Sequence, residues 1–133
     1  MNILLGINSS AETINNWIAT VNAEFGLSKD NAKCAAYFAA IKNQCIFILE
    51  PEFYAVLTTD TDMWLRREMH VVSYYIKPES RNIRLFLDIQ RKFEELAKAF
   101  DCKFLVQGSH FGDRLYKYLE RNGYKVATMR KEL

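Results

Sequence analysis

The stretch that decides the fold runs from Glu68 to Phe100 and reads EMHVVSYYIKPESRNIRLFLDIQRKFEELAKAF. Its first part, His70–Ile76, is rich in β-branched and aromatic residues, which pack well on a pleated sheet. Pro78 ends this run, and from Leu85 onward the apolar residues recur at steps of three and four, as on one face of a helix. The stretch therefore predicts a strand, a turn and a long helix.

The turn between this strand and this helix is a candidate anion site. A helix that begins at a sharp turn exposes unpaired N–H groups and the positive end of its dipole, and both attract phosphate. Arg81 and Arg84 flank the predicted helix start, so with the amides of residues 82–85 they form the predicted site. The alternative is that the turn binds nothing, as most turns of this kind do.

Composition and length limit the classes of protein to consider. The chain has 133 residues, half of them hydrophobic, which predicts one globular domain over residues 1–133. A net charge of +2 gives no support for nucleic-acid binding, and no apolar run is long enough to span a membrane. The three cysteines are scattered without metal-ligand spacing, so we expect buried thiols, no metal site and a cytoplasmic protein.

Two helices are expected before the central stretch. Asn2–Ile7 is a short apolar segment and is interpreted as a first strand. Ser9 precedes Glu12 with capping-box spacing and predicts a helix that runs to about Glu24. Ser28 is the predicted cap of a second, alanine-rich helix, whose small residues suit close packing.

The middle of the chain predicts antiparallel strands. Cys45–Leu49 and Phe53–Thr58 are two strand-like runs separated by a proline-containing turn. Asp60–Asp62 is the next predicted turn. Trp64–Ile76 then reads as one unusually long strand, and its length indicates a central strand that is bent or bulged.

The C-terminal part completes a βαβ unit. Lys103–Gln107 is a short strand candidate, and a strand reached through a helix is expected to be parallel to, and adjacent to, the strand ending at Ile76. A short helix over Arg114–Arg121 and a last strand over Tyr124–Met129 follow. The predicted fold is an α/β domain: a mixed, mostly antiparallel sheet of about six or seven strands with one parallel pair, flanked by about four helices.

This order of elements resembles that of the GCN5-related N-acetyltransferase (GNAT) superfamily. In that family the central strand ends in V-x-P-x-x-R-G-x-G-x-G, and here the residues are IKPESRNIRLF, so Ile76, Pro78 and Arg81 match. The three glycine positions hold Asn82, Arg84 and Phe86. A phenylalanine there can fill the space that a diphosphate needs, whereas an arginine can hold phosphate directly.

A second matching segment lies near the C-terminus. Leu119–Tyr124, LERNGY, resembles the family's Y-E-K-x-G-F, and Gly123 and Tyr124 match. Leu119 stands where the family often has a tyrosine as general acid. The resemblance implies acetyl-CoA as the cofactor, with these binding residues: Tyr74, Tyr75, Ile76, Arg81, Asn82, Ile83, Arg84, Leu85 and Phe86.

Acetyl transfer to an amine needs a base, and the predicted central strand offers one. Glu68 and His70 are two residues apart, which puts their side chains on one face of a strand. The alternative is that Glu68 is a solvated strand end and His70 a packing residue. Tyr116 and Tyr118 lie near the place expected for the acid, although a tyrosine in a short amphipathic helix is more often part of the core.

Two functions of different classes follow from the resemblance. The first is an acetyl-CoA-dependent N-acetyltransferase acting on a small-molecule or protein amine. The second is a catalytically degenerate protein of that fold that binds a protein partner. Small phage-encoded members of the family include virion components, so the second function implies a phage protein in the host cytoplasm or the virion.

Overall fold

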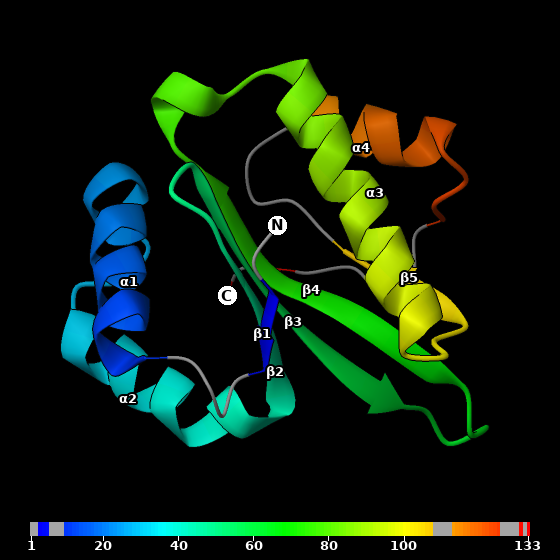
Figure 1. The fold of residues 1–133 in the computed structure, drawn as a ribbon, viewed down its shortest axis with the longest axis horizontal. Coiled ribbons are helices and arrows are strands. Elements are labelled where there is room, and N and C mark those ends of the chain that lie inside the picture. Colours follow the sequence, from blue (N-terminus) through cyan, green and yellow to red (C-terminus); the bar gives the residue numbers. More distant parts are fainter. Residues whose placement is uncertain (1–2, 6–9, 108–112, 126–130, 132) are drawn as a thin grey trace.

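A computed structural model describes residues 3–5, 10–107, 113–125, 131 and 133. Its helices are α1 (Ala11–Phe25), α2 (Asn31–Ile41), α3 (Ile83–Ala99) and α4 (Asp113–Arg121), and short 3₁₀ turns cover 42–44 and 78–80. Its strands are β1 (Ile3–Leu5), β2 (Cys45–Leu49), β3 (Phe53–Thr61), β4 (Arg67–Ile76) and β5 (Phe104–Val106). Figure 1 shows α1 and α2 to one side of the sheet and α3 to the other.

The five strands form one mixed sheet in the order β1-β2-β3-β4-β5. Neighbouring strands are antiparallel except β4 and β5, which are parallel and joined through α3. The predicted fold class, parallel pair and long helix are thus confirmed. The sheet has five strands within the described residues, and the predicted last strand over Tyr124–Met129 lies mostly outside them.

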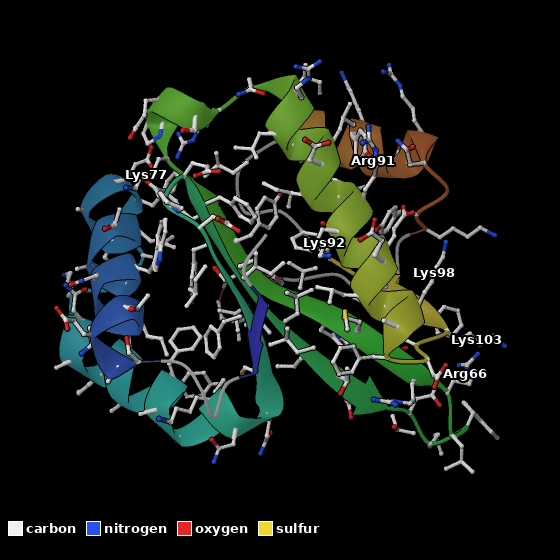
Figure 2. All side chains as sticks on the ribbon, in the orientation of Figure 1. Arg66, Lys77, Arg91, Lys92, Lys98 and Lys103 are labelled. Carbon is white, nitrogen blue, oxygen red and sulfur yellow. The ribbon has the colours of Figure 1, made fainter. Side chains whose placement is uncertain are left out.

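The face of the sheet beneath α3 is closely packed. Ile89, Phe93, Leu96 and Ala97 of α3 meet a sheet surface that includes Phe53, Leu57 and Met69. Phe93, Ile89, Leu57 and Met69 have no exposed surface. Burying an apolar side chain of this size stabilises a fold by roughly 1.5–3 kcal/mol, so this face makes a large contribution to stability. The polar face of α3, with Arg91 and Lys98, points to solvent (Figure 2).

The opposite face carries α1, α2 and an aromatic cluster. Trp17 of α1 stacks on Tyr54 of β3 with ring centroids 5.3 Å apart and contacts Tyr75 of β4 edge-on at 5.9 Å. The ammonium of Lys77 lies over the Trp17 ring, 5.8 Å from its centroid (Figure 2). Helix α2 has no fully buried residue, so it covers the sheet less completely than α3 does.

Both predicted N-caps of the first two helices were wrong by one or two residues. Ser10 caps α1, because its hydroxyl accepts the N–H of Thr13. Asp30 caps α2 by accepting the N–H of Lys33, whereas the Ser28 hydroxyl accepts the N–H of Asp30. Ser9 lies outside the described residues. Gly26 ends α1 at φ 60, in the left-handed region that favours glycine.

The predicted strand over Trp64–Ile76 was also wrong at its start. Strand β3 continues to Thr61, and the hairpin turn lies at Asp62–Arg66 instead of Asp60–Asp62. One Asp62 carboxylate oxygen accepts the N–H groups of Trp64 and Arg66 and the other accepts Nε of Arg66, which closes the turn. These hydrogen bonds favour the ionised carboxylate and so lower the pKa of Asp62. The bond from the backbone N–H of Arg66 has the largest effect.

The predicted bulge is present in β4. Ser73 pairs with Val56 and Val71 pairs with Leu57, which leaves Val72 as the extra residue. The three cysteines are free thiols, but only Cys45 is buried, so the prediction of buried thiols was wrong for Cys34 and Cys102, which are partly exposed. No helix among the described residues is long and apolar enough to cross a membrane.

Candidate functional site

The two acid–base candidates of β4 lie in contact. The Nε2 atom of His70 is 3.0 Å from Oε2 of Glu68, and both side chains are about one-third exposed, at 36% and 27%. The sequence had predicted that Glu68 and His70 share one face of the strand, and this is confirmed by the hydrogen bond. A carboxylate that accepts a hydrogen bond from an imidazole fixes the orientation of the ring.

His70 lines a cavity of about 540 Å³ on the α2 face of the sheet. It is also lined by Thr58 and Asp60 of β3, Tyr37 of α2 and Val72 at the bulge. Thr58 is the direct cross-strand partner of His70, and Asp60 is the partner of Glu68. A cavity lined by an imidazole, three hydroxyl-bearing residues and a carboxylate suits a cationic, hydrogen-bonding molecule such as an amine.

The cavity adjoins a fork in the sheet. Strands β4 and β5 pair only at Glu68, Met69 and His70, opposite residues 104–106. Beyond His70, residues 71–76 of β4 continue without a β5 partner among the described residues. An extended chain can add to such an edge through backbone hydrogen bonds. His70 therefore lies where this edge begins.

Three predicted cofactor-binding residues end β4 and point to different faces. Tyr74 and Ile76 pack with the cluster under α3, and Tyr74 contacts the Phe93 ring edge-on at 5.8 Å. Tyr75 faces α1. Burial raises the pKa of Tyr74 to about 12, so its phenol stays neutral at physiological pH. All three side chains serve packing, which leaves their backbone groups as the means of contact with a ligand.

Arg81 is engaged by the protein itself. Its Nη2 donates to Glu24 Oε2 at 2.6 Å, and its Nε donates to the carbonyl of Ile76 at 2.9 Å. The guanidinium also lies over the rings of Phe25 and Tyr75, at 5.7 and 5.5 Å from their centroids. Arg81 thereby ties the β4–α3 turn to the end of α1. An anion would have to compete with Glu24 for it.

The start of α3 is partly capped by its own sequence. Asn82 Oδ1 accepts the N–H of Leu85 at 2.9 Å, and the N–H of Phe86 bonds the Asn82 carbonyl. The N–H groups of Ile83 and Arg84 have no acceptor within the helix. Arg84 is exposed and makes no ion pair with any described residue. Two amides and one guanidinium thus remain for an anion at this turn.

Phe86 faces α4. Its ring contacts the Tyr118 ring edge-on, with centroids 4.9 Å apart. Tyr118, a predicted acid, is therefore a packing partner of α3 and only partly buried. Tyr116 lies in α4 one residue before Lys117, and its side chain is outside the described part of the structure.

Sequence reasoning missed the part of the site contributed by β3 and α2. Asp60 was assigned to a turn, whereas it lies in β3 opposite Glu68. Its role depends on strand register, which no local pattern specifies. Tyr37 lies in a helix predicted only as a packing element. Among the described residues there is no cluster of three or more His, Cys, Asp or Glu side chains that could hold a metal ion.

Comparisons with known proteins show the fold. No family model matches the chain, and no curated protein matches it by sequence. Solved structures match along its whole length. A Trypanosoma brucei acetyltransferase has a TM-score of 0.70 and 11% identity and covers 99% of this chain and 97% of its own. An aminoglycoside acetyltransferase from an uncultured soil sample has a TM-score of 0.72, with 11% identity over 99% and 95% of the two chains.

A third similar structure contains a ligand. It is a predicted acetyltransferase from Clostridium acetobutylicum with acetyl-CoA, at a TM-score of 0.68 and 12% identity, covering 99% of this chain and 94% of that one. These TM-scores show a shared, GNAT-like fold, and identities this low leave the activity to be argued from the site.

Proposed function

We propose that the protein is an N-acetyltransferase that uses acetyl-CoA to acylate a small-molecule or protein amine. The observation that carries the proposal is the position of the His70–Glu68 pair at the fork between β4 and β5, where His70 lines the cavity of about 540 Å³. A base at that point lies between an open strand edge and a cavity suited to an amine.

The residues present fit most of acetyl-CoA. The free edge of β4 over residues 71–76 suits an extended pantetheine arm, which pairs with backbone groups and needs no particular side chain. Arg84 and the amides of Ile83 and Arg84 suit the phosphates. When bound, acetyl-CoA supplies an acetyl group activated as a thioester.

Each residue of the pair then has a defined task. An amine is protonated at neutral pH and is a nucleophile only after it loses a proton. Asp60 attracts the ammonium group into the cavity, and neutral His70 accepts its proton. Glu68 holds the imidazole in place and stabilises the positive charge that His70 gains. The 27% exposure of Glu68 leaves a path for the proton to water.

The rival function is a binding protein of the same fold that has lost catalysis. Two contacts at the turn where a diphosphate would bind favour it. Arg81 is already bonded to Glu24, and Phe86 is already packed against Tyr118. The two functions differ in whether acetyl-CoA is consumed.

Transfer of radiolabelled acetyl groups to a panel of amines tests the proposal. The panel contains a polyamine, an aminoglycoside, a lysine peptide and an aromatic amine. We expect one class to be acetylated, and His70→Asn to lower the rate by about 10²- to 10⁴-fold, the usual contribution of a general base. Arg91→Gln, on the exposed side of α3, is the matched control and leaves the rate unchanged.

The pH profile separates a base from a packing residue. Rates measured against pH for the wild-type protein and for His70→Asn make the distinction, because replacing a proton-accepting group removes the pH dependence that this group imposes on the rate. If His70→Asn keeps the wild-type rate and pH profile, His70 is not the base. Absence of transfer to every amine would favour the binding protein.

A further inference from the structure

The tip of the β3–β4 hairpin exposes apolar side chains to water. Met63, Trp64 and Leu65 follow one another there and are 83%, 71% and 85% exposed. Apart from the C-terminal Leu133, they are the three most exposed large apolar residues in the described part of the chain. Single exposed apolar residues are ordinary, but a run of three on a protruding hairpin indicates an interaction site (Figure 1). We call Met63–Leu65 the hairpin tip.

The protein holds the hairpin tip in a well-bonded turn. One Asp62 carboxylate oxygen accepts the N–H groups of Trp64 and Arg66, at 2.8 and 3.0 Å. The Asp62 carbonyl accepts the N–H of Leu65, and the Asp62 N–H donates to the Arg66 carbonyl, each at 3.0 Å. Leu65 lies at φ 61, which glycine adopts freely and leucine only with strain. The turn alone would favour glycine there, and an exposed leucine adds little to packing, so folding does not account for this side chain.

Positive charge gathers on the α3 side of the hairpin tip. Arg66 follows the tip directly, Lys98 is exposed in the last turn of α3, and Lys103 is exposed just before β5. The Lys103 N–H donates to the Arg67 carbonyl at 2.8 Å, which joins the start of β5 to the base of the hairpin. The cations of Arg66 and Lys103 both lie over the Phe104 ring, at 5.1 and 5.8 Å from its centroid. Figure 2 shows Arg66, Lys98 and Lys103 at the same end of the molecule.

The carboxylates near the hairpin tip do not cancel this charge. Asp62 is paired with Arg66 at 2.8 Å, and Asp101 is the one carboxylate between α3 and β5. Asp60 lines the His70 cavity, on the side of the sheet away from α3. The α3 side of the tip therefore presents more positive than negative charge, which a negatively charged surface complements.

A lipid surface fits this combination better than a protein surface does. A stable protein partner covers about 800 Å² on each side, and a convex tip of three side chains offers far less. A lipid interface closes around a convex tip, and tryptophan is enriched at that depth because its ring is apolar and its N–H is polar. Lysine and arginine beside an inserted apolar segment are attracted by anionic headgroups. An acidic peptide would match the charges and leave the tip in water.

From these features we propose that the protein binds peripherally to an anionic membrane surface. The hairpin tip enters the headgroup region, and Arg66, Lys98 and Lys103 contact the negative groups of the lipids. The His70 cavity lies on the other side of the sheet and stays accessible. None of the residues described as lining that cavity belongs to the hairpin tip, so membrane binding is independent of acetyl transfer.

Sedimentation with lipid vesicles tests the proposal without any variant. One set of vesicles holds phosphatidylcholine alone, and the other holds equal parts of phosphatidylcholine and phosphatidylserine. At physiological ionic strength we expect the affinity for the anionic vesicles to be about tenfold higher, and to fall as salt is added. Trp64 is 71% exposed and Trp17 only 8%, so a blue shift of the emission on binding reports that the tip has left water.

Two matched pairs of variants separate the tip and its charges from general effects. Trp64→Ser should weaken binding to anionic vesicles about tenfold, whereas Leu27→Ser, at an exposed position between α1 and α2, should not. Lys103→Gln should weaken it about fivefold, whereas Lys29→Gln, which makes the same change in net charge between α1 and α2, should not. All four positions are exposed, so we expect an unchanged Tm, which checks that each variant folds.

Three results would overturn the proposal. The first is no sedimentation with anionic vesicles, or equal sedimentation with anionic and neutral ones, and it needs no variant. The second is equal binding by the two members of either variant pair. The third is binding of poly-glutamate in place of anionic vesicles, lowered by Lys103→Gln and not by Trp64→Ser, which would assign the surface to an acidic protein.

Discussion

The two faces of the sheet are built differently. Under α3 the surface is filled by fully buried side chains such as Ile89 and Phe93. The α1–α2 face carries the His70 cavity, a second cavity of about 250 Å³ lined in part by Phe38, and the buried hydroxyl of Tyr54. Within the described residues, one sheet thus carries a closely packed face and a face with unfilled space and one buried, unpaired hydroxyl.

This difference places most of the stability on one face and the proposed site on the other. An unfilled cavity loses dispersion contacts and an unpaired hydroxyl loses a hydrogen bond, so the α1–α2 face is less stabilising than its area suggests. Such features persist where a ligand uses them. The α3 face can offset their cost because its cluster contains ten buried side chains.

The largest expected effect is on the packed face. Phe93→Ala removes a ring with no exposed surface that also contacts Tyr74, and we expect it to lower the free energy of unfolding by about 3–5 kcal/mol. Phe38→Ala, on the cavity wall, is the matched change and should cost less than half as much. Urea denaturation measures both. Equal losses would show that the two faces are packed alike.

A smaller effect is expected at the start of α3. Asn82→Ala removes the N-cap, so we expect a loss of about 1 kcal/mol, whereas Asn82→Asp keeps the cap and most of the stability. Asn82→Ala also frees the Leu85 N–H to bind an anion, so the affinity for acetyl-CoA should not fall. A weaker affinity in Asn82→Ala would mean that the Asn82 side chain itself holds the ligand.

The smallest effect is at the exposed link between α1 and the β4–α3 turn. The hydrogen bond from Arg81 lowers the pKa of Glu24 below its usual value of 4.5. A carboxylate with a depressed folded-state pKa stabilises the fold above its unfolded pKa, and this contribution is lost as pH falls through the folded value. The Tm difference between wild type and Glu24→Gln should therefore be positive at neutral pH and shrink below pH 4.5.

Glu120→Gln is the control for that titration. Glu120 is exposed on α4 and makes no ion pair with a described residue, so its replacement should give no difference that depends on pH in this range. If the Tm difference between wild type and Glu24→Gln stays constant down to low pH, the ion pair between Glu24 and Arg81 does not stabilise the turn.

The parts of the fold that could be predicted are those with a local repeat. The three- and four-residue period of α3 and the β-branched run of β4 specify their elements without help from the rest of the chain. The hairpin turn could not be located, because Met63, Trp64 and Leu65 continue the apolar pattern of a strand. Their turn depends on the Asp62 carboxylate and on Leu65 at φ 61.

The same division applies to the site. The contact between Glu68 and His70 follows from a spacing of two residues in one strand, so the sequence predicts it. Asp60 joins them through cross-strand register. The Tyr54 hydroxyl has no hydrogen-bond partner among the described residues, which depends on the side chains that pack around it. Neither property belongs to a residue alone. The engagement of Arg81 by Glu24 joins positions 57 residues apart, which no motif specifies.

Calorimetry of acetyl-CoA binding to the unmodified protein tests most directly whether the α1–α2 face and the fork form an acetyltransferase site. We expect acetyl-CoA to bind at micromolar affinity and CoA to compete with it. Acetyl-CoA should also raise the Tm, because a ligand that binds only the folded state stabilises it. Arg84→Ala should weaken this binding, since Arg84 is the guanidinium left free at the turn. The absence of any heat at millimolar acetyl-CoA would contradict the proposed activity and favour the binding protein of the same fold.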